Sequence, residues 1–227
     1  MRQVTDFSDE RNKGWCVHCG GPYETDDHMP SKVFLDRPFP ENLPVTPACA
    51  SCNEGFSRDE EYLACLLECI LAGSAHPDDV ERSAIARKLR DQPGLRKRLE
   101  AARRSEGDGV LWDVEVERVN NVVVKLARGH VAFESGEPRL DEPAGRGFQP
   151  LLAMSPAVRR DFEHVPDLPQ IWPEVGSRAM SRLFVTGVDV FDEGWQEVQS
   201  RRYRYRVDGA HVRMVIRDYL AAEVWWD

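Results

Sequence analysis

The distribution of apolar residues predicts helices in the first half of the chain. The run LACLLECILA (residues 63–72) is apolar on almost every face, as in a buried helix, and its Cys65 and Cys69 lie four apart on one side as reduced core residues. The run RSAIARKLRDQPGLRKRLEAARR (residues 82–104) predicts two amphipathic helices, separated at a Pro-Gly pair and carrying their charges outside.

The pattern changes after residue 104. The polar, glycine-rich stretch 105–109 predicts a linker, and the alternation of apolar and polar residues over 110–119 predicts a strand. Residues 119–133 fit a helical face and also contain a β-branched run typical of a strand. We favour the helix, which Gly129 need not end.

The end of the chain predicts an antiparallel meander. The segments WQEVQ, YRYRV, HVRMVIRD and LAAEVWW alternate, and Asp208-Gly209 supplies a hairpin turn. Upstream, Ser155 before a proline predicts a helix start, whereas the Pro- and Gly-rich stretches 136–150 and 164–177 predict loops. The aromatic residues of the meander either stack on bases or form one apolar strand face, and the second is favoured: Tyr203, Tyr205, Trp225 and Trp226.

Composition and charge are those of a globular protein and argue against a membrane protein. The chain has 227 residues, of which 41% are hydrophobic and 30% charged, as in ordinary globular proteins. No apolar run has the length of a membrane span and no signal-like stretch follows the first methionine, so we expect a cytoplasmic protein with no membrane contact. The net charge of −9 argues against a simple nucleic-acid coating protein but does not exclude a nuclease, because the distribution of charge matters more than its sum.

Four of the six cysteines form two CxxC pairs, Cys16/Cys19 and Cys49/Cys52, within fewer than forty residues. Tetrahedral zinc needs four ligands from two such knuckles, and cytoplasmic thiols stay reduced and available for it. The alternatives are buried free thiols or disulfides, which this spacing does not favour. We therefore predict one structural Zn²⁺ held by all four cysteines.

Residues between and after the knuckles offer hydrolytic chemistry. His28 can take a proton from water near neutral pH, and the oxygens of Asp27 and Asn53 are the hard ligands that Mg²⁺ prefers. His28 otherwise serves as a surface-loop residue or a zinc ligand, and Asn53 as a helix N-cap. Asn42, in a proline-rich stretch, is either a supporting residue or a turn residue. His18, inside the first knuckle, is expected to face solvent.

These motifs together carry a family resemblance. CVHCG, DDHMPSKVF, ENL and PACASCN, between residues 14 and 62, resemble the HNH endonuclease superfamily in its zinc-stapled form, similar to the phage endonuclease VII type of junction resolvase. The following NEGFSRDEEY is similar to bacterial HNH proteins. The resemblance implies a ββα-metal fold in which a hairpin carries the Asp-His and a helix closes the site.

The resemblance also implies roles for single residues. His28 matches the general base, Asn42 the middle asparagine, and Asp27 and Asn53 the ligands of a catalytic Mg²⁺, for which Mn²⁺ can substitute. It implies hydrolysis of phosphodiester bonds in DNA, in phage defence or mobile-element biology. The alternatives are a zinc-stapled binding or interaction module without catalysis, and an RNase or toxin using the same site.

A dense basic run supplies the expected nucleic-acid contact, with a solvated helix face as the alternative. Its candidate residues are Arg87, Lys88, Arg90, Arg96, Lys97, Arg98, Arg103 and Arg104.

We thus predict an α+β protein in three parts: a nuclease unit (1–75), a basic helical segment (76–105) and an α+β module (106–227). The last part would select substrate or bind a partner, including a second copy of the chain.

Overall fold

The computed structural model describes residues 10–41, 43–107, 109–164 and 194–227. The chain divides into two compact units: a first unit of Met1–Phe56 with Val123–Asp227, and a second unit of Ser57–Val122. Two helices, α2 (Ala50–Ala72) and α5 (Val116–Ser135), each contribute residues to both units. Helices and antiparallel strands coexist, which confirms the predicted α+β class; the three-part domain organisation stays a prediction.

The first unit begins with the short helix α1 (Glu10–Lys13), followed by an antiparallel hairpin. Its strands are β1 (Thr25–His28) and β2 (Val45–Ala48), paired from Thr25 opposite Ala48 to His28 opposite Val45. The 3-10 turn η1 (Lys32–Phe34) lies between them, and α2 starts two residues after β2. The local order is therefore strand, strand, helix.

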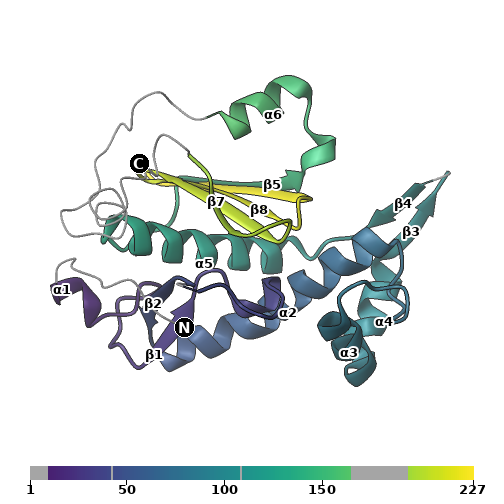
Figure 1. The fold of residues 1–227 in the computed structure, drawn as a ribbon, viewed down its shortest axis with the longest axis horizontal. Helices are drawn as coiled ribbons and strands as arrows, with labels where there is room; N and C mark the ends of the chain where they lie inside the picture. The colour runs from purple at the N-terminus through teal and green to yellow at the C-terminus, as the bar shows by residue number, and fades with distance from the viewer. Residues whose placement is uncertain (1–9, 42, 108, 165–193) are drawn as a thin grey trace. The chain divides into compact units, whose positions relative to one another are not determined.

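The second half of the first unit contains a five-stranded antiparallel sheet of order β5-β9-β8-β7-β6. Strands β5, β7 and β8 of this sheet are labelled in Figure 1. The meander β6 (Gln196–Gln199), β7 (Tyr203–Asp208), β8 (His211–Ile216) and β9 (Leu220–Trp225) confirms the prediction, with Gly209 at φ 59° in the predicted turn.

The loop predicted for 136–150 is confirmed for residues 136–144, and strand β5 (Gly145–Pro150) corrects it for the rest. It pairs with β9 along its whole length, from Gly145 opposite Trp225 to Pro150 opposite Leu220. Backbone hydrogen bonds to β9 hold this edge strand in place. Its glycines and proline hide the alternation of apolar and polar residues from which a strand is predicted. The predicted loop at 164–177 lies, except for its first residue, outside the described residues.

Helices cover both faces of the sheet (Figure 1). On one face, His130 of α5 hydrogen-bonds the Tyr203 hydroxyl (2.8 Å) and stacks on the Tyr205 ring with centroids 3.7 Å apart. On the other, Val215 packs with Leu151 of the 3-10 turn η2 (Leu151–Ala153) and with α6 (Pro156–Glu163), which Ser155 caps as predicted through the Val158 N–H. Tyr203, Tyr205 and Trp226 are buried, in agreement with an apolar strand face, whereas Trp225 is exposed.

Helix α5 also packs against the N-terminal hairpin. It confirms the helix predicted over 119–133, and Gly129 lies inside it. A Cβ atom at Gly129 would lie 2.1 Å from the sulfur of Met29, which is fully buried one residue after β1. Glycine therefore allows the close approach of helix and hairpin at a cost in helix propensity.

The second unit contains most of α2, then α3 (Ser83–Asp91), α4 (Pro93–Ala102) and the hairpin β3 (Arg103–Glu106)–β4 (Gly109–Trp112). The two predicted amphipathic helices are confirmed, with Pro93 starting the second. Cys65 and Cys69 are buried in α2, also as predicted.

Two sequence predictions fail in the second unit. In the expected linker 105–109, Ser105 and Glu106 belong to β3 and Gly109 to β4, and Gly107 follows β3 with φ 58°. The strand expected over 110–119 stops at Trp112, because Arg118 and Asn121 both reach the Asp59 carboxylate (2.6 and 2.7 Å). A helix places residues three apart on one face, so these tertiary contacts favour the helix over the strand that the alternation predicts.

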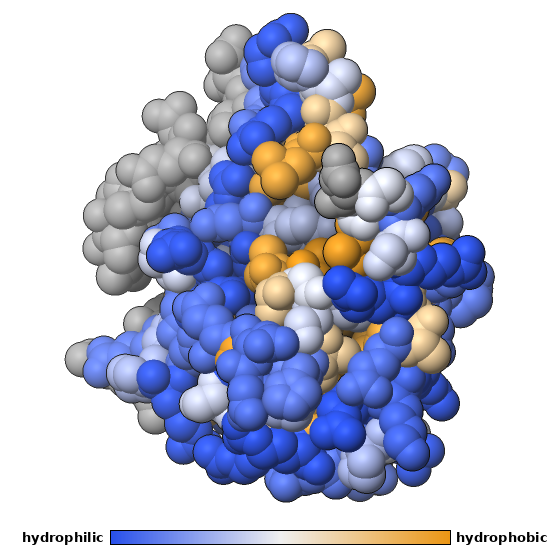
Figure 2. Space-filling model, turned by 90° about the vertical axis from the view of Figure 1, so that its right-hand side faces the viewer, coloured by the Kyte–Doolittle hydropathy of each residue, from blue (hydrophilic) through white to orange (hydrophobic). Residues whose placement is uncertain are grey.

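Hydrophilic side chains cover most of the face shown in Figure 2, with apolar residues exposed between them. The exposed large apolar residues of the second unit are Leu71, Val110, Leu111 and Val116. Among the helices of the described ranges, none has the length and apolar character needed to cross a membrane.

Candidate metal centre and the Asp-His strand

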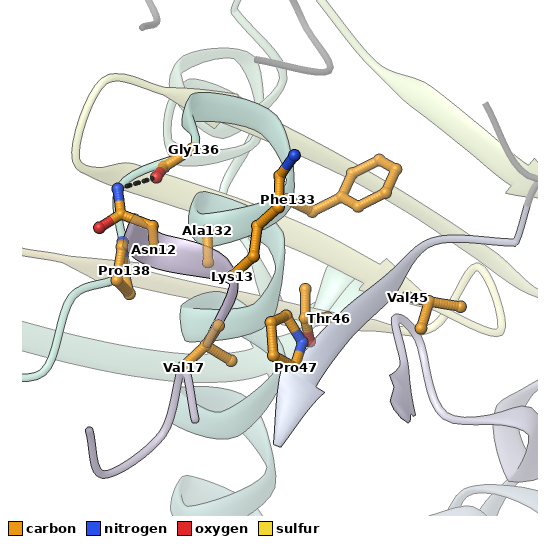
Figure 3. A pocket seen from close by; sticks show the side chains of 10 residues that line it. All are labelled: Asn12, Lys13, Val17, Val45, Thr46, Pro47, Ala132, Phe133, Gly136 and Pro138. Atoms are coloured by element: carbon orange, nitrogen blue, oxygen red, sulfur yellow. Dashed lines mark hydrogen bonds between the residues drawn. The ribbon is translucent and has the colours of Figure 1, made fainter. Parts of the chain in front are cut away.

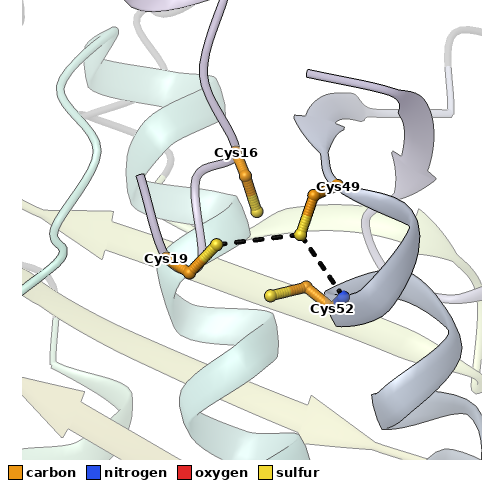
Figure 4. Close-up of side chains that lie close together, drawn as sticks. All are labelled: Cys16, Cys19, Cys49 and Cys52. Atoms are coloured by element: carbon orange, nitrogen blue, oxygen red, sulfur yellow. Dashed lines mark hydrogen bonds between the residues drawn. The ribbon is translucent and has the colours of Figure 1, made fainter. Parts of the chain in front are cut away.

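The four predicted zinc ligands converge at the base of the N-terminal hairpin (Figure 4). Cys16 and Cys19 lie in the loop before β1, Cys49 lies between β2 and α2, and Cys52 lies in the first turn of α2. Their sulfur atoms all lie within 4.8 Å of one another, and none forms a disulfide. The folding of the hairpin thus brings the two knuckles together.

The donor set fits zinc. Tetrahedral coordination with Zn–S bonds of about 2.3 Å places sulfur atoms about 3.8 Å apart. The Sγ atoms of Cys19 and Cys49 are 3.7 Å apart, and all four ligands are soft sulfur atoms. The group can therefore hold a structural zinc ion that joins the loop before β1 to the start of α2.

Hydrogen bonds in the cluster favour the thiolate of Cys49, whereas burial raises the pKa of Cys16 and of Cys52. The backbone N–H groups of His18, Gly21 and Cys52 lie 3.4 Å from cysteine sulfur atoms to which they donate. The Ser51 hydroxyl, 3.2 Å from the sulfur of Cys49, lowers the pKa of that thiol to about 6. Zinc binds the thiolate form, so at least this ligand is prepared for the metal at neutral pH.

His18 corrects the expectation of a solvent-facing residue, since its side chain is fully buried. The ring packs edge-on against Phe56 of α2, and Nε2 lies 3.0 Å from Oδ2 of Asp27. Burial lowers the pKa of His18 despite the opposing effect of Asp27, so the ring is neutral and donates its Nε2–H. The knuckle turn points this side chain inward because Asp27 offers it a partner.

Asp27 is held from a second side. Lys125 of α5, 98 residues away in sequence, donates from Nζ to Oδ1 of Asp27 (2.9 Å) and to the Ser31 hydroxyl (2.8 Å). Burial raises the pKa of Asp27, but the His18 hydrogen bond and the Lys125 charge outweigh it and leave that pKa below its usual value. Asp27 is thus an ionised, buried carboxylate with both oxygens engaged.

His28 lies one residue further along β1 and differs from Asp27 in its surroundings. It is half-buried, and its side chain has no hydrogen bond or ion pair to any residue within the described ranges. Burial, with the Lys32 charge as the next cause, lowers the pKa of His28 below its usual value. The ring is therefore neutral at pH 7, the form that accepts a proton.

Asn53, in the first turn of α2, points at the same strand. Its Nδ2 lies 3.4 Å from both the Thr25 hydroxyl and the Asp26 carbonyl oxygen, to which it donates. The amide hydrogens are thus directed at β1, and Oδ1 has no partner among the described residues. Asn42 lies outside the described residues.

A small pocket in the first unit lies beside this strand pair and involves none of the predicted catalytic residues (Figure 3). At one side the Asn12 amide donates to the Gly136 carbonyl (2.9 Å), and the buried Thr46 hydroxyl, opposite Asp27 in the hairpin, has no partner in the described part of the chain. Its lining residues are Asn12, Lys13, Val17, Val45, Thr46, Pro47, Ala132, Phe133, Gly136 and Pro138.

The residues predicted to contact nucleic acid all lie in the second unit, on α3, α4 and β3. Arg87 and Lys97 are exposed and have no hydrogen bond or ion pair to another described residue, whereas Arg103 donates to the Gly73 carbonyl (2.8 Å). The other five form ion pairs: Lys88 with Glu61, Arg90 with Asp78, Arg96 with Glu100, Arg98 with Glu115 and Arg104 with Asp113.

Sequence reasoning missed two residues of the Asp27 environment. Lys125 lies in an apolar stretch, where an ionisable residue on the inward face of a helix signals a buried partner. His18 carried no signal beyond its place inside a knuckle.

Comparison with models of protein families, with curated proteins and with solved structures finds no match to the chain.

Proposed function

We propose that the chain is a metal-dependent endonuclease of the ββα-metal type that hydrolyses phosphodiester bonds in DNA. The carrying observation is the approach of Asn53 to β1, the strand that bears Asp27 and His28. Three residues with complementary chemistry thereby belong to one hairpin-helix unit, whose ends the cysteine cluster ties together.

Each residue has a role in the proposed reaction. The neutral His28 ring takes a proton from the attacking water. Asp27 and the Oδ1 atom of Asn53 would hold Mg²⁺, since carboxylate and amide oxygens are its preferred ligands. When bound, Mg²⁺ stabilises negative charge on the phosphate and on the leaving oxygen. Zinc at the four cysteines would hold the loop before β1 and the start of α2 together. We propose that Asn42 supports the loop that carries His28.

A second candidate is a zinc-stapled binding module without catalysis. The buried Lys125–Asp27 ion pair favours it, because it gives Asp27 a structural use that requires no metal. The half-buried, unpartnered His28 favours the enzyme, since a purely structural histidine at that depth is usually hydrogen-bonded. An RNase with the same site is the third candidate, since the chemistry acts on the phosphate of either polymer.

The deciding experiment incubates zinc-loaded protein with supercoiled plasmid and, separately, with total RNA. Magnesium is omitted or supplied, rather than chelated, so that zinc stays in place; zinc content is measured in both samples. We expect plasmid nicking that requires Mg²⁺ and is absent from His28→Ala. RNA cleavage alone would reassign the substrate, and no cleavage of either would favour the binding module.

A further inference from the structure

The site contains a cation supplied by the chain itself. The Lys125 side chain is 1% exposed and that of Asp27 is 5% exposed, and the two form a hydrogen-bonded ion pair with the Ser31 hydroxyl as a further acceptor. The lysine comes from α5, which is packed against the hairpin at Gly129, so its backbone cannot retreat without separating the two elements.

The ammonium balances the charge of the carboxylate. Asp27 and Lys125 form an ion pair of opposite charges, with Nζ 2.9 Å from Oδ2 and both side chains buried. A divalent ion contacting Asp27 would share the carboxylate with an ammonium group whose Nζ lies 2.9 Å from both oxygens. Like charges a few ångströms apart in a buried site repel strongly, because little water screens them.

We infer that Lys125 is a built-in counter-cation that competes with divalent metal for Asp27 and so sets the metal affinity of the site. The inference rests on the proposed function only in taking Asp27 as the carboxylate that a metal contacts. Lys125 is a positioning residue: it acts through Asp27, and its burial keeps it from substrate. The competition raises the metal concentration that the site needs for binding.

The test measures Mn²⁺ binding by electron paramagnetic resonance on zinc-loaded wild type, Lys125→Met and Lys125→Arg. Methionine has a similar length to lysine and no charge, so we expect the Lys125→Met variant to bind Mn²⁺ at least ten-fold more tightly than wild type. Without Mn²⁺ the Met variant should melt below wild type, because a buried carboxylate has lost its partner, and Mn²⁺ should restore much of the loss. Lys125→Arg keeps the charge and should retain weak binding.

The double variant Lys125→Met with Asp27→Asn is the matched control. Removing the carboxylate together with the ammonium should recover melting without metal and abolish the gain in Mn²⁺ affinity. Equal Mn²⁺ affinity in wild type and Lys125→Met, or the same gain in the double variant, overturns the inference. If Lys125→Met folds only when refolded with Mn²⁺, the competition is supported; failure to refold with Mn²⁺ as well counts against it. Cleavage by wild type is scored separately, so loss of the proposed function leaves these binding results interpretable.

Discussion

Nε2 of His18 lies 3.0 Å from Oδ2 of Asp27, and this hydrogen bond joins the first cysteine knuckle to the strand that carries the proposed catalytic residues. His18 sits between two of the cluster cysteines, so a metal ion that fixes the knuckle also fixes the ring that holds Asp27. The candidate zinc site and the proposed Mg²⁺ site are therefore linked through His18, although their ligands are separate.

Removing one of the four cysteines should lower the stability of the protein and disturb the position of the first knuckle. Structural zinc contributes folding free energy directly, so Cys49→Ser should lower zinc content from one ion per chain and lower the melting temperature. Because the cluster holds the knuckle of His18, plasmid cleavage should fall as well. Elemental analysis, thermal melting and the cleavage assay measure the three effects.

Cys65→Ala provides the control, since Cys65 is buried in α2 outside the cluster. It should keep one zinc ion per chain. Wild-type protein purified without chelator and found free of zinc would contradict the assignment of the four cysteines.

His28→Ala should abolish proton transfer without disturbing the fold. We expect cleavage to fall by roughly 10²-fold or more, the usual contribution of a general base. Zinc content and melting temperature should stay close to wild type, because the His28 side chain has no hydrogen-bond partner among the described residues. His76→Ala is the control, as His76 is an exposed histidine of the second unit. Cleavage at the wild-type rate by the His28 variant would leave the hairpin as a structural resemblance only.

Asn53 can be tested apart from its hydrogen bonds. Asn53→Ala removes the side-chain oxygen and should raise the Mg²⁺ concentration needed for cleavage, with partial rescue by Mn²⁺. Thr25→Val removes one acceptor of the Asn53 amide but leaves Oδ1 in place, so it should change the Mg²⁺ requirement less. Titration of cleavage against Mg²⁺ compares the two. An unchanged requirement in Asn53→Ala would remove Asn53 from the metal site.

The parts of the fold that follow local rules could be predicted from the sequence. The cysteine spacing identified the cluster, because two knuckles impose their own geometry on any surrounding chain. The capped helix at Ser155 and the turn at Gly209 were likewise set by residues that act on their own backbone.

The failures share a dependence on distant partners. Strand β5 exists because β9 lies beside it, and α5 begins where Asp59 can accept from Arg118. Lys125 could not be placed at Asp27, because 98 residues separate them and nothing local specifies the packing of α5 on the hairpin. The candidate catalytic residues could thus be identified from the sequence. The Lys125 ammonium that balances the Asp27 carboxylate could be found only from the tertiary structure.

His130 makes stability sensitive to mild acid. Burial lowers its pKa to about 3, whereas the unfolded chain protonates histidine near its usual value of about 6.5. The folded pKa is the lower one, so stability from the neutral ring is present above about pH 6.5 and is lost as pH falls towards 3, at up to about 1.4 kcal/mol per pH unit. Between pH 7 and 5 the wild type should lose about 2 kcal/mol more than His130→Gln, whose amide can still bond the Tyr203 hydroxyl. Urea unfolding of both proteins at both pH values measures this difference. Any loss of zinc in acid affects the two proteins equally, so it cancels from the comparison. Equal losses would show that His130 does not titrate between folded and unfolded states.

The basic segment is the surface that we propose for contact with DNA. Each phosphate contact releases counterions, so removing one should reduce the slope of log affinity against log salt by about 0.9. Lys97 is exposed and has no ion-pair partner in the described chain, whereas Arg96 and Arg98 pair with Glu100 and Glu115. Replacing Arg96, Lys97 and Arg98 together with Gln should reduce this slope by at most about three units. We expect Lys97→Gln alone to give most of that reduction.

The matched control replaces Arg139, Arg146 and Arg159 with Gln. It removes the same charge from ion-paired arginines of the first unit, so it separates local contacts from the effect of net charge. DNA binding is measured across a salt series for each variant, with zinc content and the cleavage rate at saturating protein as checks that neither site has changed. A reduced slope in the Lys97 variants alone places the phosphate contact on α4. A wild-type slope in the triple variant would make this helix a solvated face, because a contact that neutralises phosphate cannot be lost without changing the salt dependence.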